Sequence, residues 1–600
     1  MSQALDNMNK IFFTVAAISV ALAISKYFAG KWKSKTQEHN EEKAVPLKSV
    51  AYGKSALGEK SRSILLAAAF VLGFAIRIYQ FGLVPGGVNQ DEAMAAVDGK
   101  ALADYATDRF GTFMPAHLYA WGYGQMSSLL SYLIAIFVKI KGFSIITARL
   151  PMLMVSIMGG IFFYLFVKDL FGKNVGLAAA LFVAINPWHF LQSRWSLDCN
   201  LLPHFFIAAM YFFHKGICAG PSVKRSNDTV AADQDGFKNG KLFRRIYLCI
   251  SMLLFGLCMY CYGVTIYTIP LLLLVMAVYY TVKKYLQISD VLICAAAYLF
   301  IAWPFLLTMA VNYFCLDTIE LPFVTIQYFP DSIRAGDILF FSDEPLRQLG
   351  NNIKSLLNVT VFQKNDLPWN GVEGFGTMYL CTMPFVLAGF VEFVRRKSEG
   401  VKSLAVFALL TGIGLGLLTN NVNVNRINLI YYGIMIFAVL GIAFTIREIW
   451  VFLCTNMAMY AVLAAMLLMT YFGDYADIIK GQFYYGFGDA LLRAEASGTQ
   501  IIYVTADTQY EGSYNVSEIL TLFYDATDAN YFQGITNSNN GMERLPYNQR
   551  FVYADITEEL AYSTINEAAS YVIRSEEAGY FDTNMYEVIS YGTFSAVVPK

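Results

Sequence analysis

The stretch SILLAAAFVLGFAIRIYQFGL at residues 63–83 decides the fold class. It is a run of mostly apolar residues with the length, about 20 residues, that a helix needs to cross a bilayer. Hydrophobic residues make up 56% of the 600 positions, charged residues make up 15%, and the mean hydropathy is +0.46. These values lie outside the usual range for a soluble domain. The chain is therefore predicted to be an α-helical polytopic membrane protein.

Further apolar runs of this length predict about 11–12 transmembrane helices in total. Residues 11–30 are the N-terminal candidate, with Lys10 before the run and Lys31 after it. No clear small-residue cleavage site follows, so we interpret this run as an anchor rather than a signal peptide. The other predicted spans are 147–168, 175–192, 202–218, 246–263, 265–282, 289–310, 374–394, 402–419, 427–446 and 449–470.

Basic residues between the spans predict the orientation, because short loops rich in Lys and Arg stay on the cytoplasmic side. Residues 31–62 are basic, so the span 63–83 is expected to run outward, and the basic loop 215–245 is expected inside. Residues 126–138 are apolar but too short for an ordinary span, and counting them as a crossing would invert the loops that follow. We therefore interpret them as an interfacial or re-entrant helix.

This topology divides the chain into three parts. Residues 1–62 form an anchor helix and a basic cytoplasmic segment, residues 63–471 form the transmembrane domain, and residues 472–600 lie outside. The long outer loops of the transmembrane domain cover about 84–146 and 311–373. The chain is thus expected in the cell membrane, as a multi-pass protein with an extracytoplasmic C-terminal part.

The C-terminal part differs in composition from the rest of the chain. It has six basic residues against 18 acidic ones and no cysteine. Strand-like runs at 500–505 and 570–573 stand beside helix-like runs at 514–525 and 556–571. A small extracytoplasmic α/β domain is therefore predicted.

Acids just outside the predicted spans are the candidate catalytic residues, because charge beside a membrane is costly unless it is paired or used. Asp91 and Glu92 could supply a general base and a second acceptor or metal ligand. The alternative is a helix N-terminus, where Asn89 and the two acids would cap the helix and complement its dipole. Asp198 lies on the same side and could likewise cap the next helix, with Arg194 as its ion partner.

Other polar residues outside the spans could bind substrate. Arg426 stands at the outer start of the span 427–446, where a guanidinium could bind phosphate in a bidentate way. The alternative is an arginine that reaches the lipid headgroups. Residues that could line a sugar pocket are Asp108, Arg109 and His117 in the first outer loop, and Trp369, Asn370 and Glu373 in the second.

Several function classes lose support from the sequence. Zinc-protease, P-loop, nucleophile-elbow and dinucleotide-binding motifs are missing where a strand and helix could support them. The net charge is -1, which gives no indication of a nucleic acid partner. The nine cysteines lie in or beside apolar segments, which argues against a disulfide framework.

Three stretches resemble the C-superfamily glycosyltransferases of family 39, which include protein O-mannosyltransferases and lipid A aminoarabinose transferases. They are GLVPGGVNQDEA (82–93), GFSIITARLP (142–151) and LFVAINPWHFLQSRWSLD (181–198), with looser matches at GFGTMYL (374–380) and NRINLI (425–430). The resemblance implies an inverting enzyme that moves a sugar from a polyprenyl-phosphate donor to an extracytoplasmic acceptor. Its partners would be this donor, a protein, lipid or glycan acceptor, and the lipid bilayer.

The resemblance also implies roles for individual residues. Asp91 would deprotonate the acceptor hydroxyl, Glu92 would orient the acceptor or the donor, and Asp198 would be a second acid near the donor phosphate. Arg426 and Arg194 would bind that phosphate. No cofactor is demanded, although a divalent cation could bind at Asp91, Glu92 and Asp198. The stretch WGYGQMSSLL (121–130) lacks the acidic residue or Lys-Pro of some members, which leaves the donor's identity open.

The alternative function is a multi-pass transporter or a flippase of lipid-linked sugars. Its coupling residues would lie near mid-bilayer on broken helices. The candidate acids cluster at outer helix ends instead, which favours the transferase. A polymer ligase of surface glycans would differ from the transferase only in its acceptor.

Overall fold

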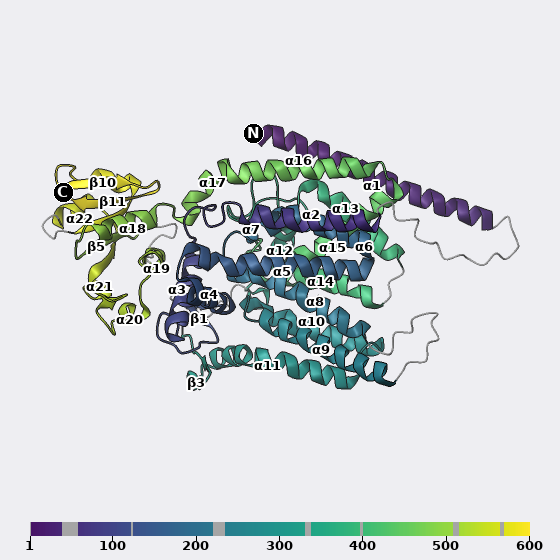
Figure 1. The fold of residues 1–600 in the computed structure, drawn as a ribbon, viewed down its shortest axis with the longest axis horizontal. Coiled ribbons are helices and arrows are strands. Elements are labelled where there is room, and N and C mark those ends of the chain that lie inside the picture. The colour runs from purple at the N-terminus through teal and green to yellow at the C-terminus, as the bar shows by residue number, and fades with distance from the viewer. Residues whose placement is uncertain are drawn as a thin grey trace.

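A bundle of long helices forms most of the molecule, and a small α/β unit stands at one end of it (Figure 1). The computed structural model describes residues 2–38, 58–121, 124–219, 234–330, 338–396, 400–507, 515–564 and 569–600. Among these residues, nine helices are long and apolar enough to cross a membrane. The predicted α-helical polytopic membrane fold is confirmed.

The long helices coincide with predicted spans. Among the nine candidate spans, the segment Ile430–Glu448 lies deepest, with 83% of its apolar window buried, and Glu59–Ile78 is the most exposed, with 17%. An apolar surface left exposed on such helices is the surface that lipid covers. The nine spans correspond to α1 (Ser2–Glu38), α2 (Glu59–Ile78), α5 (Ile145–Phe171), α8 (Leu202–Cys218), α10 (Ile269–Val282), α11 (Ile288–Tyr313), α14 (Ser403–Leu418), α15 (Ile430–Glu448) and α16 (Phe452–Phe472). A further long helix, α9 (Gln234–Cys258), overlaps the predicted span 246–263.

Two predicted spans differ from the helices observed. The span 175–192 is broken into α6 (Lys173–Ile185) and α7 (Pro187–Gln192), because Pro187 lacks the N–H that a continuous helix needs and Asn186 caps the second piece. The span 374–394 yields only α13 (Met383–Arg395). The residues before it form a turn, in which Gly374 and Gly376 have positive φ angles that a helix does not allow.

The first outer loop contains two helices that lie at the end of the bundle beside the C-terminal unit (Figure 1). These are α3 (Gln90–Tyr105) and α4 (Leu129–Lys141), with the hairpin of β1 (Leu118–Ala120) and β2 (Gly124–Met126) between them. Because α4 has 13 residues, it rises only about 20 Å and is too short to cross a bilayer. The second loop contains β3 (Ile319–Leu321), β4 (Val324–Ile326) and α12 (Pro345–Thr360).

The C-terminal unit is built on a five-stranded mixed sheet with the order β10-β11-β9-β5-β8. Strand β5 pairs in parallel with β8 and β9, while β11 is antiparallel to both β9 and β10. The strands are β5 (Ile502–Thr505), β8 (Phe551–Ala554), β9 (Ser570–Arg574), β10 (Tyr586–Ser590) and β11 (Phe594–Pro599), and the helices are α18 (Phe487–Ala496), α19 (Asn515–Tyr524), α20 (Ala529–Phe532), α21 (Tyr547–Arg550) and α22 (Glu558–Ser563).

The predicted α/β character of the C-terminal part is confirmed, but one predicted helix is too long. The strand-like runs 500–505 and 570–573 coincide with β5 and β9. The helix-like run 556–571 forms only α22, which ends at Ser563, and residues 565–568 lie outside the described part. Pairing with β5 holds Ser570 and Tyr571 in a strand, and such tertiary contacts outweigh local helix propensity.

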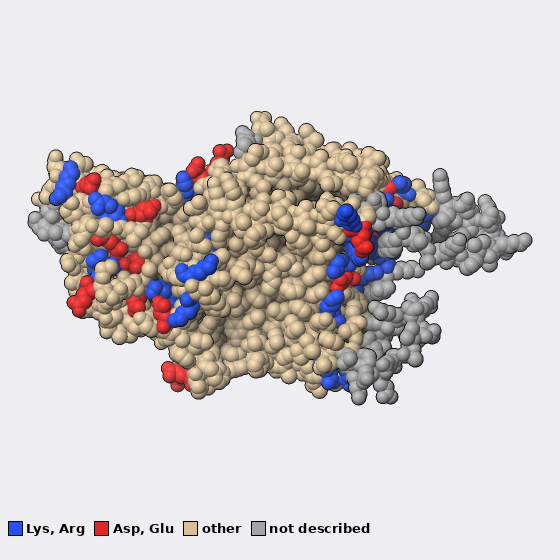
Figure 2. All heavy atoms as spheres, viewed as in Figure 1, with Lys and Arg blue, Asp and Glu red and all other residues tan. Residues whose placement is uncertain are grey.

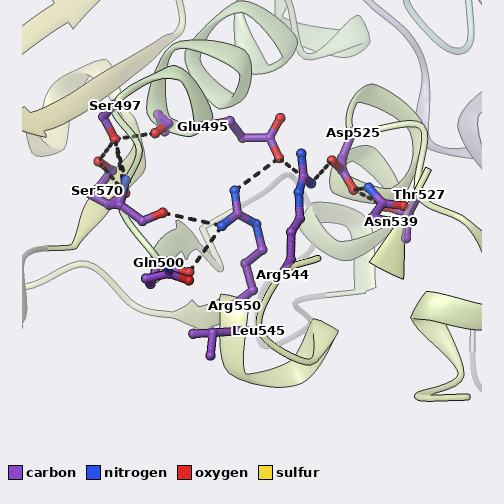
Figure 3. A network of polar contacts seen from close by, with 12 residues as sticks. Glu495, Ser497, Gln500, Asp525, Thr527, Asn539, Arg544, Leu545, Arg550 and Ser570 are labelled. Carbon is purple, nitrogen blue, oxygen red and sulfur yellow. Dashed lines mark hydrogen bonds and ion pairs between the residues drawn. The ribbon is translucent and has the colours of Figure 1, made fainter. Parts of the chain in front are cut away.

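A network of ion pairs holds the helices of the C-terminal unit against its small hairpin of β6 (Ser538–Asn539) and β7 (Met542–Glu543) (Figure 3). Arg544 contacts Asp525 at 2.7 Å and Glu495 at 3.3 Å, and Arg550 contacts Glu495 at 3.7 Å. Burial, together with the negative charge of Asp525, raises the pKa of Glu495 to about 7. These charges are used within the unit, so its acidic composition is partly structural.

Basic side chains gather at the end of the bundle opposite the C-terminal unit, where Figure 2 shows Lys and Arg in blue. Several basic residues that support the predicted orientation lie outside the described part of the chain, namely Lys43, Lys48, Lys54, Lys224, Arg225 and Lys397. The basic side chains and the C-terminal unit thus lie at opposite ends of the bundle (Figure 1 and Figure 2).

Candidate functional site

Asp91 lies in the first turn of α3, at the end of the bundle that carries the C-terminal unit. Asn89 caps the helix, since its side-chain oxygen accepts the N–H of Asp91 at 3.0 Å. The Asp91 carboxylate is half-buried and accepts a hydrogen bond from the indole N–H of Trp121 at 3.1 Å. The helix start that the sequence offered as an alternative therefore exists, and it presents Asp91 at the positive end of the α3 dipole.

The turn before Asp91 is held by the chain that leads from the bundle into the C-terminal unit. Val88 donates its N–H to the carbonyl of Phe483 at 2.7 Å, and the Asn89 amide donates to the carbonyl of Gln482 at 3.3 Å. Gly87 has a φ of +85°, and a Cβ at this position would lie 2.0 Å from the Phe483 oxygen. Only glycine allows this close approach.

Glu92 is fully buried and belongs to an ion pair. Arg149 of α5 donates to both carboxylate oxygens at 2.9 Å, and the N–H of Ser196 donates to one of them at 2.9 Å. Arg149 also donates to the carbonyls of Pro85 at 2.9 Å and Gly87 at 2.8 Å. Glu92 therefore joins the turn before Asp91 to the loop before Asp198, instead of orienting a substrate as the resemblance implied.

Asp198 and Arg426 lie near Asp91 in space. Asp198 begins a short 3-10 helix (Asp198–Leu201) and does not directly cap α8. Burial raises the pKa of the next residue's thiol, Cys199, and the charges of Asp198, Asp91 and Arg426 also act on it, so these three side chains lie within electrostatic range of Cys199. Arg426 is half-buried and donates to the carbonyl of Asn420 at 2.8 Å. Three of the predicted site residues are thus brought together.

Asn428 links the segments that carry Asp198 and Arg426, and the sequence had not singled it out. Its amide donates to the side-chain oxygen of Asn200 at 2.7 Å. Its own side-chain oxygen accepts from the indole N–H of Trp188 at 3.2 Å and from Gln192. A buried asparagine in the NRINLI stretch was the available signal, because buried amides need several partners.

Arg194 differs from the prediction. It is fully buried, and its terminal nitrogens donate to four backbone carbonyls, those of Arg77, Tyr79, Gln80 and Val84, at 2.7 to 3.0 Å. These carbonyls belong to the last turn of α2 and the residues just after it, where backbone oxygens lack helical partners. Arg194 therefore stabilises a helix end, and neither pairs with Asp198 nor remains available to bind a donor phosphate.

The pocket residues predicted in the first loop are buried. Arg109 forms an ion pair with Asp98 at 2.5 Å, and Asp108 accepts the N–H groups of Phe110 and Thr112. Burial raises the pKa of Asp108 to about 6. His117 packs with its ring 4.8 Å from that of Phe305, and burial lowers its pKa to about 4. These residues shape the loop and do not face open space.

Of the residues predicted in the second loop, Asn370 belongs to a contact network that supports the segment carrying Arg426. Asn370 is buried and donates to both oxygens of Asp366 at 3.1 and 3.3 Å, and Asp366 accepts the N–H of Val424. Asp366 thereby holds the loop that presents Arg426. Trp369 is half-buried, and Glu373 is exposed. The sequence around Asp366 does not indicate a role for it, because its importance lies only in its contacts with Asn370 and Val424.

The divalent cation site considered at Asp91, Glu92 and Asp198 does not fit the described residues. No group of three His, Cys, Asp or Glu side chains gathers among them in a way that could hold a metal ion. Both oxygens of Glu92 are already bound by Arg149.

Comparison with known proteins agrees with this architecture. Residues 127–222 match the family model described as "Dolichyl-phosphate-mannose-protein mannosyltransferase". The structure is similar to that of ArnT from Cupriavidus metallidurans bound to undecaprenyl phosphate, with a TM-score of 0.51 and 12% identity over 90% of this chain and 98% of that one. The chain has the fold of the C-superfamily glycosyltransferases.

A second structure of the same ArnT is also similar, whereas the curated proteins give no sequence match. The apo state of the same ArnT gives a TM-score of 0.50 at 11% identity, over 89% of this chain and 97% of that one. No sequence among the curated proteins matches the chain. At these identities the likeness shows the glycosyltransferase fold, and the residues of this chain must support any statement about its reaction.

Proposed function

We propose that the chain is a membrane glycosyltransferase that moves a sugar from a polyprenyl-phosphate donor to an extracytoplasmic acceptor, with Asp91 as the general base. The observation that carries this proposal is that Asp91, at the capped start of α3, lies with Asp198 and Arg426 within electrostatic range of the Cys199 thiol. A structure with the same fold, that of ArnT from Cupriavidus metallidurans, contains undecaprenyl phosphate. A base beside a cation is the arrangement that displacement of a phosphate leaving group requires.

The proposed reaction is an in-line displacement with inversion at the anomeric carbon of a hexose or pentose. The acceptor hydroxyl oxygen forms the new bond to this carbon while its proton passes to the Asp91 carboxylate. The bond from the carbon to the phosphate oxygen breaks, and polyprenyl phosphate leaves with the electron pair. Arg426 binds the phosphate as its charge develops, because a guanidinium donates two parallel hydrogen bonds to phosphate oxygens.

The neighbouring groups define what Asp91 can do. The indole N–H of Trp121 orients the Asp91 carboxylate through its 3.1 Å hydrogen bond. Asp198 supplies a second carboxylate that can accept a hydrogen bond from a sugar hydroxyl. Glu92 positions the turn and the loop from which the two acids project, and it touches neither reactant.

Asp91→Asn tests the assignment of the base. We expect kcat to fall by about 10²- to 10⁴-fold, the usual contribution of a positioned base, with an unchanged melting temperature. Asp104→Asn is the matched control, since Asp104 lies in the same helix about 20 Å from Asp91 and pairs with Lys100. A fully active Asp91→Asn protein would contradict the proposal.

The assay also separates the transferase from a flippase. Purified protein in detergent is incubated with labelled polyprenyl-phosphate hexoses, and label on a new acceptor is measured. Detergent removes the two compartments that transport needs, so a flippase would release no labelled product there. Label that stays on the polyprenyl phosphate for every sugar and acceptor tried would contradict the proposed activity.

A further inference from the structure

A long apolar groove runs along the bundle, away from the candidate site. It has a volume of about 1580 Å³ and lies between α2, α6, α15 and α16. On α16 its lining extends from Leu453 to Leu468, which corresponds to a rise of about 22 Å along the helix. The groove thus covers much of the roughly 30 Å of bilayer hydrocarbon. Asp91, Asp198 and Arg426 are not among its lining residues.

Small side chains create the space in this groove. Ala461, Ala464 and Ala465 of α16 line one wall, and Ala69 of α2 lines the opposite wall. Ala461 and Ala465 are exposed, so this face of α16 is not covered by another of the described helices. An open, apolar channel of this kind between membrane helices is filled by lipid chains, because water is excluded from the bilayer core.

Basic side chains line one end of the groove, opposite the C-terminal unit. They are Arg395, Arg396, Lys402 and Arg447, and the indole of Trp450 lies beside them. Figure 2 shows basic side chains gathered at this end of the bundle. Tryptophan is enriched where a membrane helix meets the headgroups, so this end has the character of an interface.

Nearby carboxylates neutralise only part of this charge. Glu392 is fully buried and accepts ion pairs from Arg395, Arg396 and Arg447 at 2.5 to 2.8 Å. Glu448 pairs with Arg447 at 2.8 Å. Among these described side chains, four cations against two anions leave a net charge of +2 at the groove end. Such a charge attracts an anionic headgroup, whereas a zwitterionic headgroup gains less from it.

We propose that this groove binds an anionic glycerophospholipid. Its phosphate lies against Arg395, Lys402 and the neighbouring arginines, and its acyl chains lie between α2 and α16. A basic pocket between transmembrane helices on the cytoplasmic side is the arrangement that binds anionic lipid headgroups. The lipid fills space between α16 and the remainder of the bundle and fixes the position of this last helix, independently of the proposed sugar transfer.

Fluorescence of Trp450 tests this proposal with the full-length protein in vesicles. The vesicles contain phosphatidylcholine and phosphatidylglycerol, and one of the two carries brominated acyl chains that quench nearby indoles. The Trp450 signal is the difference between the native protein and Trp450→Phe. Each unit of positive charge at the groove end should strengthen binding of an anionic lipid by about fivefold. With a net charge of +2, we expect phosphatidylglycerol to be preferred roughly 25-fold over phosphatidylcholine. Equal quenching by the two lipids would overturn the proposal.

Two sets of variants locate the site. Arg395→Gln with Lys402→Gln removes two positive charges, and we expect the preference to fall to near one, while Lys283→Gln with Lys284→Gln removes two exposed charges elsewhere and leaves it unchanged. Ala461→Phe with Ala465→Phe fills the groove and should abolish the preferential quenching, whereas Val462→Phe, on the exposed surface outside the lining, should not. Melting temperatures confirm that each variant folds, and a preference that survives both groove variants would overturn the proposal.

Discussion

Replacing Glu92 by Gln tests whether this acid positions the site or takes part in the reaction. The side chain keeps its size but loses the charge that pairs with Arg149, and both side chains are fully buried. Breaking a buried ion pair by removing one partner costs about 3–5 kcal/mol, because the remaining charge is left uncompensated. We therefore expect Glu92→Gln to destabilise the folded protein by about this amount.

The contacts of Arg149 predict which of the two single variants loses more stability. Arg149→Met leaves the Glu92 carboxylate uncompensated and also removes the donors to the carbonyls of Pro85 and Gly87. Each buried acceptor that loses its partner costs a further 1–3 kcal/mol, roughly. Arg149→Met should therefore destabilise the protein more than Glu92→Gln, and the double variant should be less damaging than the sum of the two, because the charges are removed together.

Thermal unfolding in detergent measures the two single variants and the double variant, and sugar transfer per folded molecule is measured on the same samples. Asp104→Asn is the control for a pair nearer the surface, for which we expect a change below about 1 kcal/mol. If Glu92→Gln kept its full stability but lost its activity as Asp91→Asn does, the positioning role would be refuted and Glu92 would be assigned to the reaction.

Three further predictions follow from single contacts. Gly87→Ala should lose about 1–2 kcal/mol from its φ of +85° alone, and more from the clash with the Phe483 carbonyl, so both melting temperature and kcat should fall. Asn428→Ala should leave the buried oxygen of Asn200 without its donor and lower stability by roughly 1–3 kcal/mol, read from thermal unfolding. Burial raises the pKa of Glu577 to about 7 from an ordinary value of 4.5, so the folded state binds the extra proton. The stability that the protonated Glu577 contributes is full below pH 4.5 and is lost as the pH rises to 7. Glu577→Gln should therefore make the melting temperature depend less on pH in this range.

The membrane fold could be predicted because its cause is local in the sequence. A helix in lipid needs about 20 apolar residues in succession, and this condition can be checked run by run. The break in the predicted span 175–192 also has a local cause, which is Pro187. In the C-terminal unit the cause is no longer local, because β9 starts at Ser570 through pairing with β5, whose paired residues are 68 positions away in the sequence.

The candidate site could be predicted only in part, for a related reason. Asp91, Asp198 and Arg426 share the outer ends of helices, and topology alone places them at the same side of the membrane. Glu92 pairs with a residue 57 positions away in the sequence, and Arg194 bonds to carbonyls more than 100 positions away. No rule of sequence spacing predicts contacts of this range. The resemblance implied that Arg194 binds phosphate, whereas the backbone carbonyls at the end of α2 and just after it provide it with four acceptors within the protein.

The site is thus assembled from segments that other residues hold in place. Arg149 and Glu92 fix the turn before Asp91 to the loop before Asp198, and Asn428 fixes the segment after Arg426 to the one after Asp198. The same turn is bonded to the carbonyls of Gln482 and Phe483, which belong to the connection into the C-terminal unit. Because a shift of about 1 Å at a reacting group costs an enzyme much of its rate, the C-terminal connection contributes to the geometry of Asp91 through this turn.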